Sequence, residues 1–186
     1  MLSDSARKKL LGIARRAVEA VVSGRGSPAE AVDHAELQGK QGAFVTLKTH
    51  GRLRGCIGQF ISDQPLWKTV RGLGVQSATE DPRFVGSRLT PAELAGLDIE
   101  VSVLSPLERI ANPLDIELGV HGIHIRRGYR TGCFLPQVAT ETGWSKEEFL
   151  SHCCAGKAGM QPDAWKDPQT EVLVFTAEII REGENG

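Results

Sequence analysis

The chain has 186 residues and a formal net charge of −1, with 40% hydrophobic and 24% charged residues. This composition is typical of a soluble globular domain, and the charge argues against a bulk nucleic-acid binder, which usually carries a strong positive excess. No apolar run reaches the roughly 18 residues of a membrane span, and the N-terminus lacks the continuous apolar stretch of a signal peptide. The protein is therefore expected in the cytoplasm, with its four cysteines as free thiols.

An amphipathic helix is predicted near the N-terminus. Apolar residues recur every three or four positions from Leu10 to Val21. Ser3 or Asp4 would cap the start of this helix, and Gly24 suits its end.

A β-hairpin is predicted next, over the stretch GAFVTLKTHGRLRGCIGQF at residues 42–60. Apolar and polar residues alternate on both sides of His50 and Gly51, which would form the turn. The alternation places Arg52, Arg54 and Cys56 together on one face of the second strand.

Glycines flank the cysteine of this hairpin. Gly55 and Gly58 carry no side chain, so another backbone or a ligand can approach the strand closely there. Two arginines beside a thiol would stabilise its thiolate form. The alternative is a structural cysteine that packs in a tight strand, because cysteine is small and apolar.

The middle of the chain predicts a helix and a strand separated by two breaks. The helix would run from about residue 64 to 79 with Ser62 or Asp63 as its cap, and the DPRF stretch at 81–84 would end it. Thr90 and Glu93 form a capping box that opens a short helix. A strand follows in LDIEVSVLS, with Glu100 on the face opposite its apolar residues.

The last third predicts further strands and helices. These are a strand at 120–128, a short strand entering a helix near Pro136, a helix capped by Ser145 and Glu148 and ended by Gly156, and one strand in EVLVFTAEII. Helices and strands mix without a regular βαβ rhythm, so the fold class is α+β with a mainly antiparallel sheet and flanking helices.

The segments GAFVTLKTHGRLRGCIG, DPRF, LDIEVSVLS, HGIHI, FLPQV and EEFLSHCCAGKAGM occur here in the order found in the AMMECR1 family. The chain resembles this family from about residue 42 to 180. Its bacterial and archaeal members are also called AmmeMemoRadiSam system protein A, after gene neighbours that encode a Memo-like protein and a radical S-adenosylmethionine protein. The resemblance implies a single AMMECR1 domain over 1–186, with a larger and a smaller lobe, antiparallel sheets and a cleft.

The resemblance also centres the expected site on LRGCIG. Arg54 would hold an anionic group of a small substrate, and Cys56 would contact its reacting part. Glu100 or Glu141 would orient one of these two residues. The candidate catalytic residues are Cys56 and Glu141. The candidate substrate contacts are Arg54, Gly55, Gly58, Asp81, Arg83, Glu100, His121, Gln137, Cys154 and Lys157.

The residues leave several alternatives open. For Gln137 and Lys157 a structural role is the favoured alternative, and Arg83 could pair with Asp81 or Glu100. His121 and His124 are three residues apart in a predicted strand and would face opposite sides, so neither a metal nor another cofactor is expected.

Three functional hypotheses remain at this stage. The first is action with the Memo-like and radical S-adenosylmethionine proteins on a small anionic substrate. The second is a non-catalytic regulatory module that binds RNA or protein, although the charge makes nucleic acid the weaker expectation. The third is a hydrolase with a Cys–His pair. A homodimer is a further expectation.

Overall fold

The computed structural model describes residues 1–26 and 31–183. It divides into two compact units. The first comprises Met1–Leu104 together with the residues from Glu178 onward, and the second comprises Ser105–Ala177. Both units combine helices with antiparallel strand pairs, so the fold class is α+β, as the sequence predicts.

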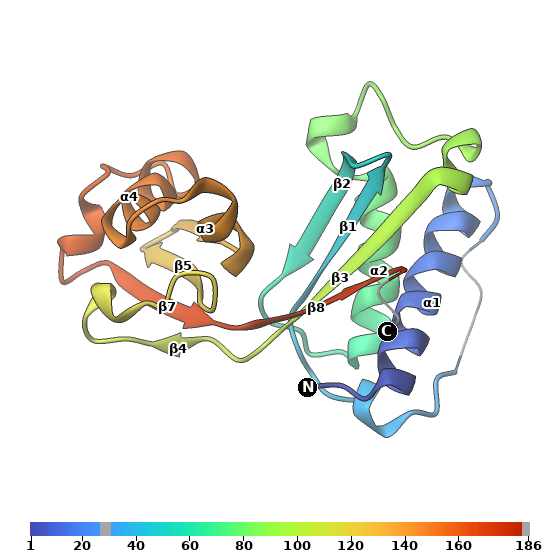
Figure 1. Ribbon diagram of the computed structural model, residues 1–186, viewed down its shortest axis with the longest axis horizontal. Helices are drawn as coiled ribbons and strands as arrows, with labels where there is room; N and C mark the ends of the chain where they lie inside the picture. Colours follow the sequence, from blue (N-terminus) through green and yellow to red (C-terminus); the bar gives the residue numbers. More distant parts are fainter. Residues whose placement is uncertain (27–30, 184–186) are drawn as a thin grey trace. The chain divides into compact units, whose positions relative to one another are not determined.

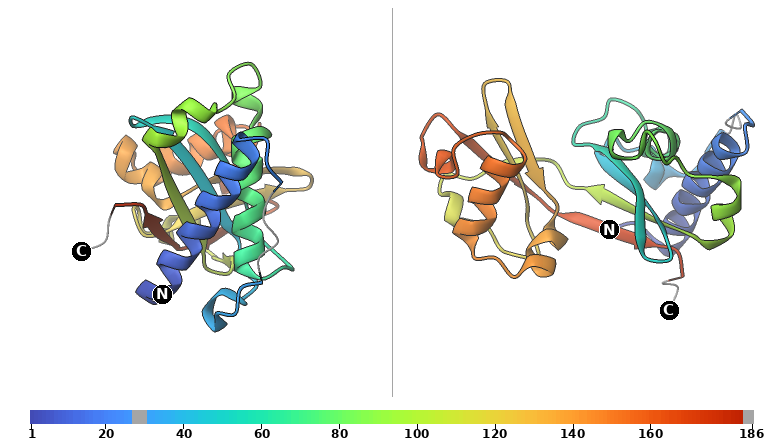
Figure 2. Two further views of the ribbon diagram at one scale, coloured as in Figure 1. Left: turned by 90° about the vertical axis from the view of Figure 1, so that its right-hand side faces the viewer. Right: turned by 90° about the horizontal axis from the view of Figure 1, so that it is seen from above.

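The first unit is a four-stranded sheet with two long helices. Its strand order is β2-β1-β3-β8. The strands are β1 (Ala43–Thr49), β2 (Arg52–Gln59), β3 (Leu97–Leu104) and β8 (Ala177–Arg181). The helices are α1 (Asp4–Val22) and α2 (Leu66–Thr79), with short 3-10 helices η1 (Ala35–Leu37), η2 (Pro82–Phe84) and η3 (Pro91–Gly96). Figures 1 and 2 show α1 and α2 side by side on one face of this sheet.

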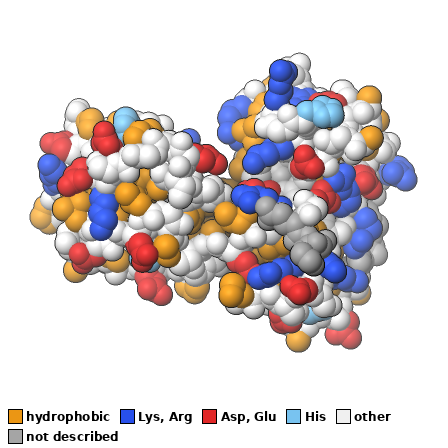
Figure 3. All heavy atoms as spheres, viewed as in Figure 1, with side chains coloured by type: hydrophobic (Ala, Val, Ile, Leu, Met, Phe, Trp, Pro, Cys, Tyr) orange, Lys and Arg blue, Asp and Glu red, His pale blue; other side chains and the backbone are white. Residues whose placement is uncertain are grey.

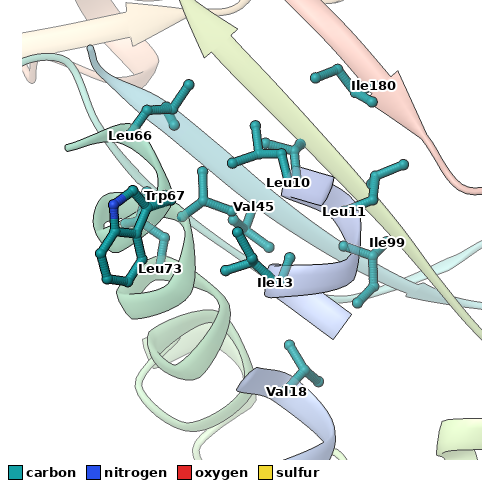
Figure 4. Packing of buried hydrophobic residues seen from close by; sticks show 14 of the residues in the cluster. Leu10, Leu11, Ile13, Val18, Val45, Leu66, Trp67, Leu73, Ile99 and Ile180 are labelled. Atoms are coloured by element: carbon teal, nitrogen blue, oxygen red, sulfur yellow. The ribbon is translucent and has the colours of Figure 1, made fainter. Parts of the chain in front are cut away.

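The core of the first unit lies between the helices and the sheet. Figure 4 shows Leu10 and Ile13 of α1 among residues of the sheet and of α2. Leu10, Val45 and Ile99 are almost completely buried in this cluster. Burial of each such side chain contributes about 1.5–3 kcal/mol, so the apolar spacing of the first helix fixes which of its faces meets the sheet.

The predicted helix caps are partly confirmed. The hydroxyl of Ser3 accepts a hydrogen bond from the Ala6 N–H, and Thr90 forms the expected capping box with Glu93. Helix α2 begins later than predicted, after Pro65 and without a side-chain cap. The hydroxyl of Ser62 instead lies 2.7 Å from that of Thr69.

The β1–β2 hairpin turns at His50 and Gly51, as predicted. Both residues have positive φ, 48° and 74°, which is the geometry of a tight two-residue hairpin turn. The pairing shifts between Leu47 and Lys48, so Arg54 is an extra residue on β2. This bulge interrupts the alternation on which the expected common face of Arg52, Arg54 and Cys56 depends.

The second unit has the strand order β4-β7-β5-β6. Its elements are β4 (Glu108–Arg109), η4 (Pro113–Asp115), β5 (Gly122–Arg127), β6 (Arg130–Phe134), α3 (Pro136–Thr142), α4 (Lys146–Gly156), η5 (Ala164–Lys166) and β7 (Glu171–Phe175). Phe149 and Trp165 pack with Ile123 and Val172 in a separate apolar core.

The prediction of a single strand at 171–180 is wrong. It is two strands, β7 and β8, which belong to different sheets. The break falls at Thr176, whose N–H donates to the Ser105 hydroxyl and whose carbonyl accepts from the Ser105 N–H. Each half keeps a buried apolar face, so periodicity in the sequence does not reveal that the strand changes sheets. Over the described residues, no helix is both long and apolar enough to cross a membrane.

Candidate functional site

A buried carboxylate joins two parts of the candidate site in the first unit. Asp81 is only 4% exposed. One of its oxygens accepts the Cys56 backbone N–H at 2.8 Å and the Arg83 Nη2 at 2.6 Å. The other accepts the backbone N–H and the Nε of Arg83, both at 3.0 Å. Asp81 therefore binds the strand of Cys56 and the guanidinium of Arg83 together.

Arg83 also contacts Cys56 directly. Its Nη2 donates to the Cys56 carbonyl at 3.1 Å, so the Asp81–Arg83 pair holds both the N–H and the C=O of residue 56. Helix α2 ends at Thr79 and Pro82 opens η2, and the turn between them directs Asp81 and Arg83 toward β2.

The charges of this pair stabilise each other. The hydrogen bond from Arg83 lowers the pKa of Asp81 to about 2, against the opposing effect of burial. The pKa of Arg83 is raised, mainly by Asp81 and in smaller part by the Cys56 side chain. The guanidinium therefore stays positively charged beside the thiol.

The thiol of Cys56 is half-buried on the sheet face opposite the helices. Thr46 lies directly across from Cys56 on β1, and its hydroxyl is 3.2 Å from the sulfur. Glu100 of β3 pairs with Thr46 from the other side. Its carboxylate accepts the Arg181 Nε at 2.8 Å. Thr46 thus separates the thiol from a buried, paired carboxylate.

Arg54 is directed to a different partner. Its Nε donates to Glu93 at 2.7 Å, and its Nη2 reaches the second Glu93 oxygen at 3.2 Å. This pairing is the main reason why the pKa of Glu93 is lowered to about 2. The expected role of Arg54 as an anion holder stays a prediction, but its guanidinium is engaged by a carboxylate. The ring of Phe84 lies 5.7 Å from Arg54 and 5.8 Å from Arg83.

The two glycines beside Cys56 make room for the protein itself. A Cβ on Gly55 would lie 1.9 Å from the carbonyl oxygen of Ser77 in α2. A Cβ on Gly58 would lie 2.1 Å from the ring of Phe44. The sequence suggested that either another backbone or a ligand approaches these glycines. The backbone of α2 approaches Gly55, and the ring of Phe44 occupies the space beside Gly58.

Five candidates belong to the second unit. His121 is half-buried, and its Nδ1 accepts the Glu117 N–H at 3.1 Å. Gln137 lies in the first turn of α3 with a buried side-chain oxygen that has no hydrogen-bond partner among the described residues. Glu141 lies in the last turn of α3 and is exposed.

The other two flank the end of α4. Cys154 is completely buried, and burial raises the pKa of its thiol. Lys157 is exposed, with its ammonium 5.7 Å from the centre of the Phe134 ring. Ala158 and the Cβ of Lys157 pack against Gly132 of β6, which explains the KAG motif by packing. In the described part of the chain, no hydrogen bond or ion pair joins any two of these five residues.

Two residues of the first-unit site were missed in the sequence. Thr46 is the cross-strand neighbour of Cys56, and the hairpin register carries the signal that could have found it. Ser77 accepts the Ile57 N–H at 3.0 Å and donates to the Val45 carbonyl at 2.8 Å. Nothing in the sequence marks this serine of α2 as a link between both strands of the hairpin. Across the described ranges, no group of three or more His, Cys, Asp and Glu is arranged to hold a metal ion.

The fold and site define an α+β protein with two antiparallel sheets, in which a half-buried thiol lies beside a buried aspartate that pairs with a half-exposed arginine. The chain belongs to the AMMECR1 family, whose model matches residues 11–180.

Relatives and a solved structure resemble the chain over nearly its whole length. Protein MK0488 of Methanopyrus kandleri is 42% identical over 94% of this chain and 87% of its own. Protein NEQ441 of Nanoarchaeum equitans is 42% identical over 93% of this chain and 98% of its own. The crystal structure of the uncharacterized protein PH0010 from Pyrococcus horikoshii has a TM-score of 0.89 at 38% identity. The match covers 98% of this chain and 94% of the PH0010 chain.

Proposed function

We propose that Cys56 is the reactive group of a thiol site that binds a small anionic substrate, and that the protein acts in the cytoplasm with a Memo-like metalloprotein. One observation carries this proposal. The Asp81–Arg83 pair holds the peptide groups of Cys56 on both sides while its thiol remains half-buried rather than sealed.

A purely structural role for this pair is the weaker explanation. Burial of the Asp81 carboxylate costs desolvation, and well-packed apolar residues often stabilise a protein as well or better. A packing cysteine needs no charged neighbour. A guanidinium fixed beside a sulfur, by contrast, stabilises a thiolate, which is the nucleophilic form of cysteine.

Arg83 is the better candidate for the anion contact. Its side chain is 53% exposed, whereas that of Arg54 is 17% exposed and bound to Glu93. Asp81 and Cys56 use the Nε and Nη2 of Arg83, and no hydrogen bond to a described residue uses its Nη1. We therefore assign the anionic group of the substrate to Arg83 and a loop-anchoring role to Arg54.

The surface charge fits a local site of this kind better than an extended anionic partner. Figure 3 shows acidic and basic side chains interspersed on the visible face of the first unit. The four cysteines form no disulfide with one another, which agrees with a reducing compartment such as the cytoplasm. The Memo-like and radical S-adenosylmethionine partners follow from family gene neighbourhood, and in our proposal the chain supplies one half of a composite site.

Alkylation by iodoacetamide, followed by peptide mass spectrometry, tests the thiol. Cys133 also forms no disulfide and is half-buried, so it serves as an internal control in the same molecule. We expect Cys56 to react faster than Cys133. Cys56 that stays unmodified while Cys133 reacts would contradict the proposal.

Co-purification with the Memo-like protein of the same organism tests the partnership. A mixture of the two proteins and a metabolite extract should form a product that neither protein forms alone, and C56S should abolish it without preventing association. No association and no product would refute the partnership. If C56S associates with the Memo-like protein and the mixture forms as much product as with the unmodified chain, the non-catalytic module would be favoured.

A further inference from the structure

The second unit contains a pocket of about 950 Å³ at the tip of the β5–β6 hairpin. This volume is in the usual range for small-molecule sites. One wall is the hairpin turn at residues 127–130, and the other is the segment at 160–169 that follows α4. The proposal for Cys56 uses none of these residues.

An exposed aromatic ring lies on one wall of the pocket. Tyr129 is the only tyrosine of the chain and is 91% exposed. Gly128, with φ of 58°, forms the turn beside it. A tyrosine loses little conformational entropy when it is buried, because it has only two side-chain torsions, so an open ring of this kind is suited to stacking on a ligand.

Three cations of the same pocket are held in place by the protein. Arg130 donates through Nη1 to the Gly159 carbonyl at 2.8 Å. Arg127 forms an ion pair with Asp167, with its Nη2 2.9 Å from the carboxylate. The ammonium of Lys166 lies 5.1 Å from the centre of the Trp165 ring. Side chains that are ordered in advance lose less entropy when they bind an anion.

The pocket also offers hydrogen-bond acceptors beside these cations. Asp163 and Gln161 line it together with the apolar side chain of Met160. A carboxylate and an amide can accept from sugar hydroxyls or exocyclic amines, while the cations attract phosphate. The combination suits a ligand that has a planar ring, hydroxyl groups and a negative charge.

We propose that this pocket binds a nucleoside phosphate. The base stacks on Tyr129, the phosphate is bound by Arg130 and Lys166, and Asp163 and Gln161 contact the sugar or the base edge. The net charge of −1 disfavours a long nucleic-acid tract, so free nucleotides are the favoured source.

Ligand-observed NMR on the full chain tests the assignment. Adenosine, guanosine, cytidine and uridine monophosphates are titrated beside inorganic phosphate and a uridine decamer. We expect at least one nucleotide to bind more tightly than phosphate. Y129A should lose roughly 5- to 150-fold of that affinity, the loss that corresponds to removing one stacked base, whereas Y129F should retain it.

R130Q should weaken both nucleotides and phosphate. R126Q is the matched control, because Arg126 is on the same hairpin but pairs with Glu171 and does not line the pocket. Unchanged thermal midpoints would show that the variants fold. C56S should leave binding unchanged, so the two proposals can fail separately.

Two results would refute this inference. They are the absence of nucleotide binding at millimolar concentration, and equal nucleotide binding by Y129A and the unmodified chain. Much tighter, salt-sensitive binding of the decamer would support the ligand class and identify single-stranded RNA as its source.

Discussion

The carboxylate of Asp81 accepts a hydrogen bond from the backbone N–H of Cys56 at 2.8 Å, although 25 positions separate the two residues in the chain. The same carboxylate pairs with Arg83, whose guanidinium reaches the Cys56 carbonyl. The position of the thiol therefore depends on a charged group in a different segment.

D81N should destabilise the first unit. The amide keeps an oxygen for the Cys56 N–H but loses the charge that holds Arg83. We expect a loss of about 1–3 kcal/mol in the free energy of unfolding, because Arg83 is half-exposed and water screens part of the pair. Urea denaturation measures this loss, and D63N at an exposed position should change little. An equal effect of both variants would contradict the role of Asp81.

Acid should weaken the fold through the same group. Asp81 has a folded-state pKa of about 2, below its ordinary value of 3.8. A carboxylate whose pKa is lowered on folding stabilises the folded state. This contribution is fully present when the pH is above the ordinary pKa of 3.8, and it is lost as the pH falls toward the folded-state pKa of about 2. The difference corresponds to about 2 kcal/mol. Unfolding free energies from pH 6 to pH 2 should show this loss, and D81N should make the profile flatter. Parallel profiles would contradict this assignment.

Substitutions of Arg83 and Arg54 should have different effects on thiol reactivity and on stability. R83Q should slow alkylation of Cys56 by about threefold to tenfold, because it removes the positive charge beside the sulfur. R83K should retain part of the rate. R54Q should lower stability by about 0.5–2 kcal/mol through loss of the Glu93 pair and leave alkylation nearly unchanged. A larger fall in the alkylation rate with R54Q than with R83Q would contradict these separate roles.

Glycine-to-alanine substitutions test the packing of the hairpin. G55A places a methyl group against the Ser77 carbonyl, which is backbone and cannot move alone, so it should cost about 1–3 kcal/mol or more. G72A in α2 meets open space and should stabilise the helix by about 0.5–1 kcal/mol. Thermal unfolding of both variants provides the comparison. A neutral G55A would mean that the hairpin does not pack on α2 as described.

Much of the fold could be predicted because its signals are local. The Ser3 cap, the His50–Gly51 turn and the Thr90–Glu93 capping box each involve a few consecutive residues. Apolar periodicity identified which face of the first helix is buried. Propensity, capping and alternation act over a single turn or strand, so they can be inferred without knowledge of the rest of the chain.

The candidate site could be predicted only in part from the sequence. The family resemblance predicted Cys56, Asp81 and Arg83 as site residues, so their segments could be named in advance. Their mutual geometry could not. The bulge at Arg54 depends on the pairing of β2 with β1, and it turns a residue expected beside the thiol toward Glu93, 39 positions away.

By itself, the sequence determined the identity of most helices and strands, the hairpin turn, the α+β class and the family. Only the tertiary structure decided that residues 171–181 supply strands to two different sheets, that Gly55 accommodates α2, and that Asp81 holds Cys56. The physical reason is distance along the chain. Local backbone preferences act between neighbours in sequence, whereas hydrogen bonds and packing between remote segments exist only after folding has brought those segments together.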